Sequence, residues 1–234
     1  MKAAVIQFPG SNNDRDAVHA LYHVAGLETE LVWHRDFKGF EYDAVILPGG
    51  FSYGDHLRAG AIAAHSPAMK DVKEMASEGK PVLGICNGFQ ILIEAELLPG
   101  ALLQNEGLTF VCKWVILRTE TSRTVFTNAI PKGKLLRIPV AHNEGRYIHE
   151  ERVIKELEEN DQIVFRYVDQ NGKTTREANP NGALHNIAGI CNREGNVMGM
   201  MPHPERSSES ILDSNRDGLP ILQSMINVLN KRRR

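Results

Sequence analysis

Short apolar runs alternate with amphipathic segments along the first hundred residues. Two of the runs, Ala44–Leu47 and Pro81–Ile85, are unbroken, which is typical of strands buried on both faces of a sheet. Two further strands are predicted at Ala3–Phe8 and Glu30–Trp33. Apolar positions at helical spacing predict helices over Asp14–Ala25, 67–78 and Asn87–Leu98. This alternation, with short connections, predicts a parallel sheet covered by helices on both faces.

The second half of the chain is richer in strand patterns. Strands are predicted over Phe110–Leu117, Leu136–Ala141, Gln162–Val168 and Ile187–Cys191, and helices over Glu150–Glu159 and Pro220–Leu229. Asn171 and Gly172, which tolerate positive φ, predict a hairpin turn. We find no repeat, low-complexity tract or linker, so we expect one domain over residues 1–234. The predicted fold class is α/β, with a mostly parallel central sheet flanked by helices and extra antiparallel strands in the second half.

Composition and charge exclude several classes of protein. Hydrophobic residues make up 42% and charged residues 24% of the chain, and the net charge is −2, so no strong field favours nucleic acid or an anionic membrane. The basic run Lys231–Arg234 is interpreted as complementing the dipole of a last helix. The chain contains no run of about 18 apolar residues, so the sequence predicts no membrane span. Three widely spaced cysteines form neither a disulfide framework nor a zinc motif, so we expect a reduced, cytoplasmic protein without a metal site.

The most informative residue is Cys86, which stands where a buried strand ends and a helix begins at once. A side chain at such a corner points out at the carboxyl edge of the sheet, where open α/β folds bind ligands. Gly84 and Gly88 stand two residues before and after it, and they remove side chains that would collide in a sharp turn. The position of Cys86 therefore predicts a nucleophile.

The helix that begins after Cys86 matters because only the ionised form of a cysteine, the thiolate, is a good nucleophile, and a helix N-terminus favours that form. An ordinary cysteine, with a pKa near 8.5, is only about 3% thiolate at pH 7. Lowering that pKa by about 1.5 units makes half of it nucleophilic, and a helix N-terminus together with a nearby imidazolium can supply this shift. Cys112 and Cys191 lie within apolar runs and are interpreted as structural.

His203 is the candidate proton carrier among the nine histidines. It follows the apolar segment Val197–Met201 and is flanked by two prolines, which fix the backbone around it. Glu205, two residues further on, can return to the far nitrogen of the imidazole. A cysteine, an imidazole and a group that orients the imidazole are the parts that cysteine hydrolysis needs.

Gly49 and Gly50 follow the strand Ala44–Leu47 and predict a third component. Glycines allow backbone N–H groups to approach a ligand closely, and such donors can stabilise the oxyanion of a tetrahedral intermediate by roughly 3 kcal/mol each. This turn lies one strand–helix unit before Cys86, and we therefore expect it at the same edge of the sheet.

Together these stretches resemble the class I, or triad, glutamine amidotransferases, which have a flavodoxin-like fold. Within that group the chain is similar to the family of glutaminase subunits of phosphoribosylformylglycinamidine synthase, in purine biosynthesis. The similarity covers nearly the whole chain and rests on Val5–Asn12, Gly50–Asp55, Gly84–Gln90, Ala141–Tyr147, Ala178–Gly182 and Gly195–Arg206.

The resemblance implies that Cys86 attacks the side-chain amide of L-glutamine, and that His203, oriented by Glu205, protonates the departing ammonia. Water then hydrolyses the glutamyl thioester. It also implies further site residues. Backbone N–H groups near Gly50 and Asn87 would hold the oxyanion, and the bound glutamine would contact Phe51, Gln90, His142 and Asn143. Asn143 stands where this family has a small residue, so a contact by its side chain departs from the pattern.

The resemblance further implies a partner. The ammonia would pass to a separate large subunit that uses ATP and Mg²⁺ to convert formylglycinamide ribonucleotide to formylglycinamidine ribonucleotide, with a small subunit bridging the two. No cofactor is expected in this chain. Gly172–Thr174 is not a phosphate loop, because Tyr167 stands where the first glycine is required.

Three alternatives remain at this point. The chain could be a glutaminase subunit of another biosynthetic amidotransferase, or a non-catalytic regulatory subunit with the same fold. It could also be a cysteine hydrolase with the same strand-to-helix corner. The last class places its histidine directly behind the cysteine, where this chain has Phe89 and Gln90. A regulatory subunit would have no need to keep Cys86, His203 and Glu205.

Overall fold

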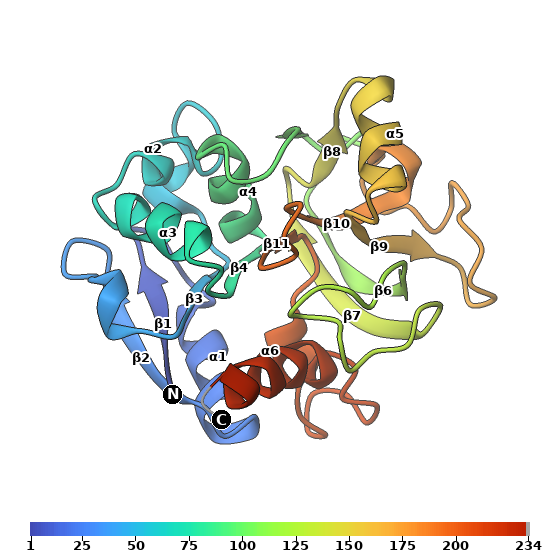
Figure 1. Cartoon of the computed structure of the whole chain (residues 1–234). Coiled ribbons are helices and arrows are strands. Elements are labelled where there is room, and N and C mark those ends of the chain that lie inside the picture. Colours follow the sequence, from blue (N-terminus) through green and yellow to red (C-terminus); the bar gives the residue numbers. More distant parts are fainter. Residues whose placement is uncertain (233–234) are drawn as a thin grey trace.

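The computed structural model describes residues 1–232 and is built around a nine-stranded sheet in the order β2-β1-β3-β4-β11-β10-β9-β6-β7 (Figure 1). The first five strands in this order pair in parallel. Their bounds are β2 Glu28–Trp33, β1 Lys2–Gln7, β3 Ala44–Leu47, β4 Val82–Ile85 and β11 Val197–Met200. This is the flavodoxin-like order, in which ligands bind beyond the carboxyl ends of the strands. The predicted α/β fold class is confirmed.

The second part of the sheet is antiparallel, as the richer strand pattern of the second half predicts. Each remaining pair along the order runs antiparallel, through β10 Ile187–Cys191, β9 Ile163–Val168, β6 Val111–Thr119 and β7 Leu135–His142. Two short strands, β5 Ala101–Leu103 and β8 Arg146–Ile148, form a separate antiparallel ribbon. The sequence pattern gave no sign of these two, because three residues are too few to establish a period.

Helices cover both faces of the parallel strands. Figure 1 places α1 and α6 on one face and α2, α3 and α4 on the other, with α5 beside the antiparallel strands. Their bounds are α1 Asp14–His19, continued by a π-helical turn over Ala20–Val24, then α2 Ala61–Ala64, α3 Ala68–Ser77, α4 Asn87–Glu94, α5 Glu151–Glu159 and α6 Leu219–Arg232. Because helices cover them on both sides, β3 and β4 are buried at every position. No helix among residues 1–232 combines the length and the apolar composition of a membrane span.

Short 3₁₀ segments complete the chain, at Gly39–Glu41, Ser52–Asp55, Leu184–Asn186 and Pro204–Ser207. Lys231 and Arg232 lie in the last turn of α6, as the dipole argument predicts, and Arg233 and Arg234 lie outside the described residues.

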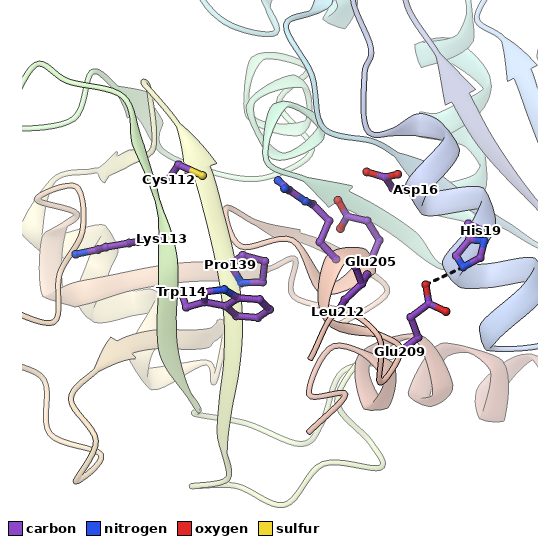
Figure 2. A pocket seen from close by; sticks show the side chains of 10 residues that line it. Asp16, His19, Cys112, Lys113, Trp114, Pro139, Glu205, Glu209 and Leu212 are labelled. Atoms are coloured by element: carbon purple, nitrogen blue, oxygen red, sulfur yellow. Dashed lines mark hydrogen bonds and ion pairs between the residues drawn. The ribbon is translucent and has the colours of Figure 1, made fainter. Parts of the chain in front are cut away.

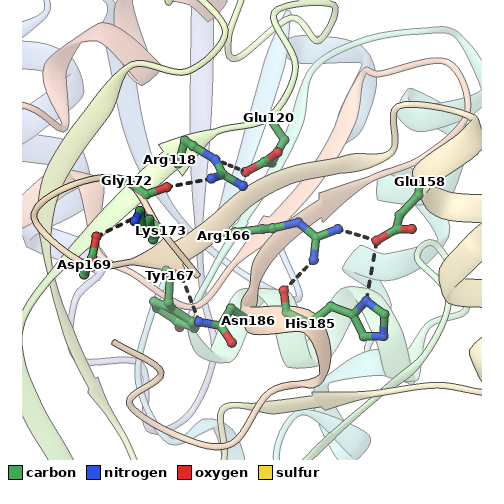
Figure 3. Close-up of polar contacts among 10 residues, drawn as sticks. All are labelled: Arg118, Glu120, Glu158, Arg166, Tyr167, Asp169, Gly172, Lys173, His185 and Asn186. Carbon is green, nitrogen blue, oxygen red and sulfur yellow. Dashed lines mark hydrogen bonds and ion pairs between the residues drawn. The ribbon is translucent and has the colours of Figure 1, made fainter. Parts of the chain in front are cut away.

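Two local predictions were wrong. The helix predicted over Asn87–Leu98 ends at Glu94, because Glu96 takes a positive φ of 61° and the chain leaves the helical path well before Pro99. Gly172 does form a tight turn with a φ of 77°, and Figure 3 shows Asp169 contacting Lys173 across it. The turn is not a hairpin, however, because no strand follows it before β10. Asp169 stabilises this loop through its side chain instead of a strand ladder.

Candidate active site

Cys86 occupies a strained corner between β4 and α4. Its backbone has φ 51° and ψ −104°, a conformation that is rare for a residue with a side chain and that is found where the surroundings hold it in place. Its N–H donates to the carbonyl of Met200 at 2.8 Å, which ties the corner to the end of β11. The Cys86 side chain is therefore held at the carboxyl edge of the parallel strands.

The two glycines around Cys86 allow this corner to form. A Cβ on Gly84 would lie 2.6 Å from the carbonyl oxygen of Gly88, and a Cβ on Gly88 would lie 1.9 Å from the carbonyl oxygen of Leu47. Real Cβ atoms do not approach backbone this closely, so α4 can begin against β3 and β4 only with glycine at both positions. The steric role predicted for these glycines is confirmed.

The sulfur of Cys86 lies against the end of the antiparallel part of the sheet. Its Sγ is 3.7 Å from the carbonyl oxygen of Ala141, near the end of β7, so the thiol can donate a weak hydrogen bond there. Cys86 is only 5% exposed. The thiol is enclosed by the loops around it, although it stands at the rim of the sheet.

His203 and Glu205 form a buried pair in the turn that follows β11. Nδ1 of His203 lies 2.6 Å from Oε1 of Glu205, and each side chain is 1% exposed. The His203 backbone N–H donates to the carbonyl of Pro139 at 2.9 Å, which fixes the turn against β7. Nε2 of His203 has no hydrogen-bond partner among the described residues. One nitrogen of the imidazole is thus held, and the other is available to a substrate.

Charges around His203 determine its protonation. Burial lowers its pKa, but the Glu205 carboxylate and the neighbouring Cys86 outweigh burial, and the pKa of His203 is raised above its ordinary value. Cys86 and His203 stand in distant parts of the sequence, but both contact the end of β7, the sulfur at the carbonyl of Ala141 and the His203 N–H at the carbonyl of Pro139.

Gly49 and Gly50 bring the end of β3 against the imidazole. A Cβ on Gly49 would lie 2.8 Å from Cε1 of His203, so the glycine lets the backbone approach the ring. Gly50 has a φ of 149°, and its Cβ position is blocked by the carbonyl of Gly10 and the backbone of Ser11, both at 2.7 Å. The strand end is thereby packed between the loop after β1 and His203, as its position in the sequence predicts.

Asn87 and Gln90 belong to a chain of hydrogen bonds that fixes the start of α4. Oδ1 of Asn87 accepts the N–H of Ser52 at 3.1 Å, and its Nδ2 donates to Oε1 of Gln90 at 2.8 Å. Nε2 of Gln90 donates to the carbonyl of Glu144 at 2.6 Å. Asn87 is the first residue of the helix, where backbone N–H groups lack an acceptor within the helix. The loops 51–55 and 141–145 are thus attached to the helix that begins behind Cys86.

His142 is buried and differs from His203 in its charge. Its Nδ1 lies 3.1 Å from Oδ1 of Asn105, and its Nε2 lies 3.5 Å from Nδ2 of Asn181. Burial and the positive charge of His203 lower the pKa of His142 to about 4. His142 is therefore neutral at pH 7, with its proton on Nδ1 facing the Asn105 oxygen and Nε2 accepting from Asn181.

Phe51 and Asn143 lie around the same site in different ways. Phe51 is 42% exposed at the start of the loop after Gly50. The backbone carbonyl of Asn143 accepts the N–H of Asn105 at 2.9 Å, and the Asn143 side chain is partly exposed.

Comparison with known proteins identifies the family. The sequence pattern of the CobB/CobQ-like glutamine amidotransferase domain matches residues 1–221. The chain belongs to this glutamine amidotransferase family. It is 57% identical to phosphoribosylformylglycinamidine synthase subunit PurQ of Methanosarcina barkeri, over 99% of both chains. It is 54% identical to the PurQ of Thermomicrobium roseum, over 97% of this chain and 96% of the relative.

Solved structures agree with these relatives. A chain in the structure of PurLQS from Thermotoga maritima is 45% identical to this one, with a TM-score of 0.85 over 97% of this chain and 98% of that chain. Another glutamine amidotransferase from Thermotoga maritima has a TM-score of 0.53 at 16% identity, over 97% of this chain and 90% of that chain, which shows a shared fold.

Sequence reasoning missed several polar residues of this amidotransferase site. Ser52, Asn105 and Asn181 hold the loops around Cys86, and they are all buried. Single asparagines and serines in loops are common, and none of these stands at a spacing that indicates chemistry. Ser52 and Asn181 lie within stretches that carry the family resemblance, which was the only available signal.

One cavity of this amidotransferase lies beside Glu205 and not beside Cys86. It measures about 550 Å³, and its walls come from α1, β6, β7 and the segment after β11 (Figure 2). Glu205 and Pro139 line it, but Cys86 and His203 do not. Since neither the thiol nor the imidazole reaches this space, it is not the place where an amide reacts.

Proposed function

We propose that this chain is the glutaminase subunit of phosphoribosylformylglycinamidine synthase, and that it hydrolyses L-glutamine to glutamate and ammonia for a partner synthetase. One observation carries the proposal. A chain similar to PurQ over its full length places a strained, enclosed cysteine beside a buried His203–Glu205 pair. A nucleophile, an imidazole and a carboxylate that orients the imidazole are the parts of a thiol amidase.

In the first half of the proposed reaction, the sulfur of Cys86 attacks the side-chain amide carbon of glutamine. The S–C bond forms as the carbonyl oxygen takes up negative charge. His203 then gives its Nε2 proton to the amide nitrogen, the C–N bond breaks, and ammonia leaves behind a glutamyl thioester. Glu205 accepts from Nδ1 throughout, so Nε2 remains the nitrogen that exchanges the proton.

Backbone donors at the ends of two strands would stabilise the oxyanion. The oxyanion needs N–H donors near the reacting carbon. We assign this role to the backbone near Gly50 and to the N–H of Asn87. The start of α4 supports the second donor, because its first N–H groups lack helical acceptors and its dipole favours negative charge. Removing one such donor from a hydrolase typically costs a factor of about 10² to 10³ in kcat.

The other predicted glutamine contacts lie on helix α4 and on the loops around Cys86. Gln90 is 6% exposed and attached to the 141–145 loop, Phe51 stands at the start of the neighbouring loop, and the His142–Asn143 segment follows Ala141, whose carbonyl faces the sulfur. We assign the amino-acid end of the substrate to Phe51, Gln90, His142 and Asn143. The cavity beside Glu205 has no part in this assignment.

The proposed partners follow from the relatives. PurLQS of Thermotoga maritima and the synthase subunit name of the curated relatives support a complex with one large and one small partner subunit. ATP and Mg²⁺ would be used by the large subunit in converting formylglycinamide ribonucleotide to formylglycinamidine ribonucleotide, with no cofactor in this chain. Ammonia that escapes into water at neutral pH is mostly protonated and no longer a nucleophile, which favours direct transfer within a complex. We place the enzyme in the cytoplasm.

Replacing the proposed nucleophile tests this function. In the reconstituted complex, Cys86→Ala should abolish synthesis from glutamine and leave synthesis from added ammonium salts intact. Cys112 is an exposed free thiol and not the buried structural residue that its apolar neighbours predicted. Cys112→Ala is therefore the matched control, and it should affect neither reaction. Loss of both reactions in Cys86→Ala, or unchanged synthesis from glutamine, would contradict the proposal.

Labelling gives an independent check. A glutamine analogue with a diazo-ketone group should modify Cys86 alone, although Cys112 is the more exposed thiol. Peptide mass spectrometry locates the label. Modification of Cys112 or Cys191 at a comparable rate would mean that Cys86 has no activated sulfur.

A further inference from the structure

Tyr167 stands at the same edge of the sheet as Cys86, three strands away. Phe165 on β9 is paired with Gly189, Gly189 with Met200, and Met200 with Ile85, so these residues lie at one level across the sheet. Strand β9 runs in the same direction as β4, because two antiparallel steps and one parallel step separate them. Tyr167, two residues beyond Phe165, therefore lies at the level where β4 gives way to Cys86.

The hydroxyl of Tyr167 is buried, and no residue of the described part of the chain accepts its proton. The residue is 0% exposed, and its hydroxyl oxygen makes no hydrogen bond with any described residue. The backbone at this position is well held, since the Tyr167 carbonyl accepts from Nδ2 of Asn186 at 2.9 Å (Figure 3). Folded proteins rarely leave a buried hydroxyl unbonded, and such groups often have a functional reason.

The neighbour of this hydroxyl, Asn181, is already engaged elsewhere. Its Nδ2 donates to the carbonyl of Gly145 at 2.8 Å and faces Nε2 of His142 at 3.5 Å, and its Oδ1 accepts the N–H of Ala183 at 3.0 Å. Burial raises the pKa of Tyr167, the Asn181 amide beside the hydroxyl lowers it as a hydrogen-bond donor does, and the charge of Cys86 raises it further. The hydroxyl therefore keeps its proton, lies within the electrostatic field of Cys86, and has no acceptor for that proton.

The chemistry of the second half-reaction supplies the missing acceptor. In the first half, the departing nitrogen uses its lone pair to take the proton from His203, so it has none left to accept from a hydroxyl. A water molecule has two lone pairs, one of which attacks the thioester carbon. The other can accept a hydrogen bond, while one of its protons passes to Nε2 of His203.

We infer that the Tyr167 hydroxyl holds the water that hydrolyses the glutamyl thioester on Cys86. The inference rests on the proposed glutaminase function and adds a residue to it. In this step the water oxygen bonds to the thioester carbon and the C–S bond breaks. The Cys86 thiolate and the protonated His203 are restored, and glutamate leaves once its new carboxyl group has lost the second proton of the water to solvent. Tyr167 is a positioning residue here, because it gives up no proton and forms no covalent bond.

Tyr167→Phe removes only the hydroxyl and tests this role in the reconstituted complex. Its first turnover, measured as a burst of ammonia release, should be unchanged, and its steady-state glutaminase rate should fall at least about tenfold. The glutamyl thioester on Cys86 should accumulate, visible by intact-mass spectrometry after acid quenching. Added hydroxylamine is itself a nucleophile and attacks the thioester without a positioned water. It should therefore restore turnover, with the glutamyl hydroxamate as the product. The melting temperature should stay the same or rise, since an unbonded buried hydroxyl does not stabilise the fold.

Tyr147→Phe is the matched control. Tyr147 is also buried, but its hydroxyl donates to the carbonyl of Pro99 at 2.9 Å. This variant should lose melting temperature, with no thioester accumulation. Wild-type turnover without accumulation in Tyr167→Phe would overturn the inference, as would a fall in its melting temperature together with a lost burst. A wild-type complex that releases no ammonia from glutamine would instead contradict the glutaminase function itself.

Discussion

Nδ1 of His203 and Oε1 of Glu205 lie 2.6 Å apart, and Pro204 alone stands between the two residues in the chain. The contact is buried at both ends, so water does not weaken it. This contact holds Nδ1 of His203 at the carboxylate and leaves Nε2 for proton transfer. The orientation of the imidazole is therefore built into a three-residue turn.

Glu205→Gln should lower kcat for glutamine by about 10²- to 10⁴-fold, the range seen when the orienting carboxylate of a triad becomes an amide. The charge that raises the pKa of His203 is lost, so the imidazole holds its proton less tightly beside the thiol. Steady-state glutaminase assays measure the effect. Glu209→Gln is the control, because Glu209 lines the neighbouring cavity and contacts His19 on the surface. Equal rates in the two variants would show that the Glu205 charge has no role.

Gly50→Ala should strongly destabilise the protein and abolish glutaminase activity. Its Cβ would lie within 2.8 Å of three backbone atoms, in Gly10, Ser11 and Asn12, so the loop must move away from His203. Gly26→Ala is the control that measures backbone strain without a steric collision. Gly26 also has a positive φ, of 75°, but no atom of the described residues lies within 4 Å of its Cβ position. Denaturant unfolding should show a loss of about 1 kcal/mol for Gly26→Ala. A similar small loss for Gly50→Ala would mean that the loop is not packed as described.

Asp55→Asn should stabilise the protein at neutral pH. Burial and the charge of Glu144 raise the pKa of Asp55 from 3.8 to about 6, and its Oδ1 is buried without a partner among residues 1–232. Because the folded state binds this proton more tightly than the unfolded state, the free energy of unfolding falls as pH rises from 3.8 through about 6. The gain from the variant, about 1 kcal/mol after solvent screening, should be present at pH 7.5 and absent below pH 4.

Melting temperatures of the wild type and the variant at both pH values measure this difference. Asp36→Asn serves as the control, because it removes a carboxylate of the same kind from an exposed position. A stabilisation by Asp55→Asn that persists unchanged at pH 4 would show that the carboxylate charge is not its cause.

Above a pH of about 4, the His142 ring should remain neutral, with its proton on Nδ1, as long as the protein is folded. Its depressed pKa means that the unfolded state takes up the proton first. Stability is therefore lost as pH falls from 6.5 towards 4, by up to about 3 kcal/mol. Nitrogen-15 NMR of the imidazole rings measures both histidines, and His203 should appear as an imidazolium at pH 7. A His142 ring that titrates near 6.5 would contradict the hydrogen bonds to Asn105 and Asn181.

The sequence predicted the fold class and the strands of the parallel half because each of them is a buried apolar run. It also singled out Cys86, His203 and Glu205, because strand ends, glycines and prolines are visible in a linear pattern. It did not predict Ser52, Asn105 or Tyr167 as parts of the site. Their positions depend on loop paths and on pairing between distant strands, such as β9 with β10, which no local period encodes.

What the sequence determined by itself is local: where strands end, where the chain must bend, and which residue stands at each bend. The glycines around Cys86 and the prolines around His203 fix backbone geometry within a few residues, so their effect can be read without a structure. Only the tertiary structure decided the charges of His142 and His203. Two histidines are chemically identical in a sequence, and they differ here because burial acts on both while a carboxylate reaches only one.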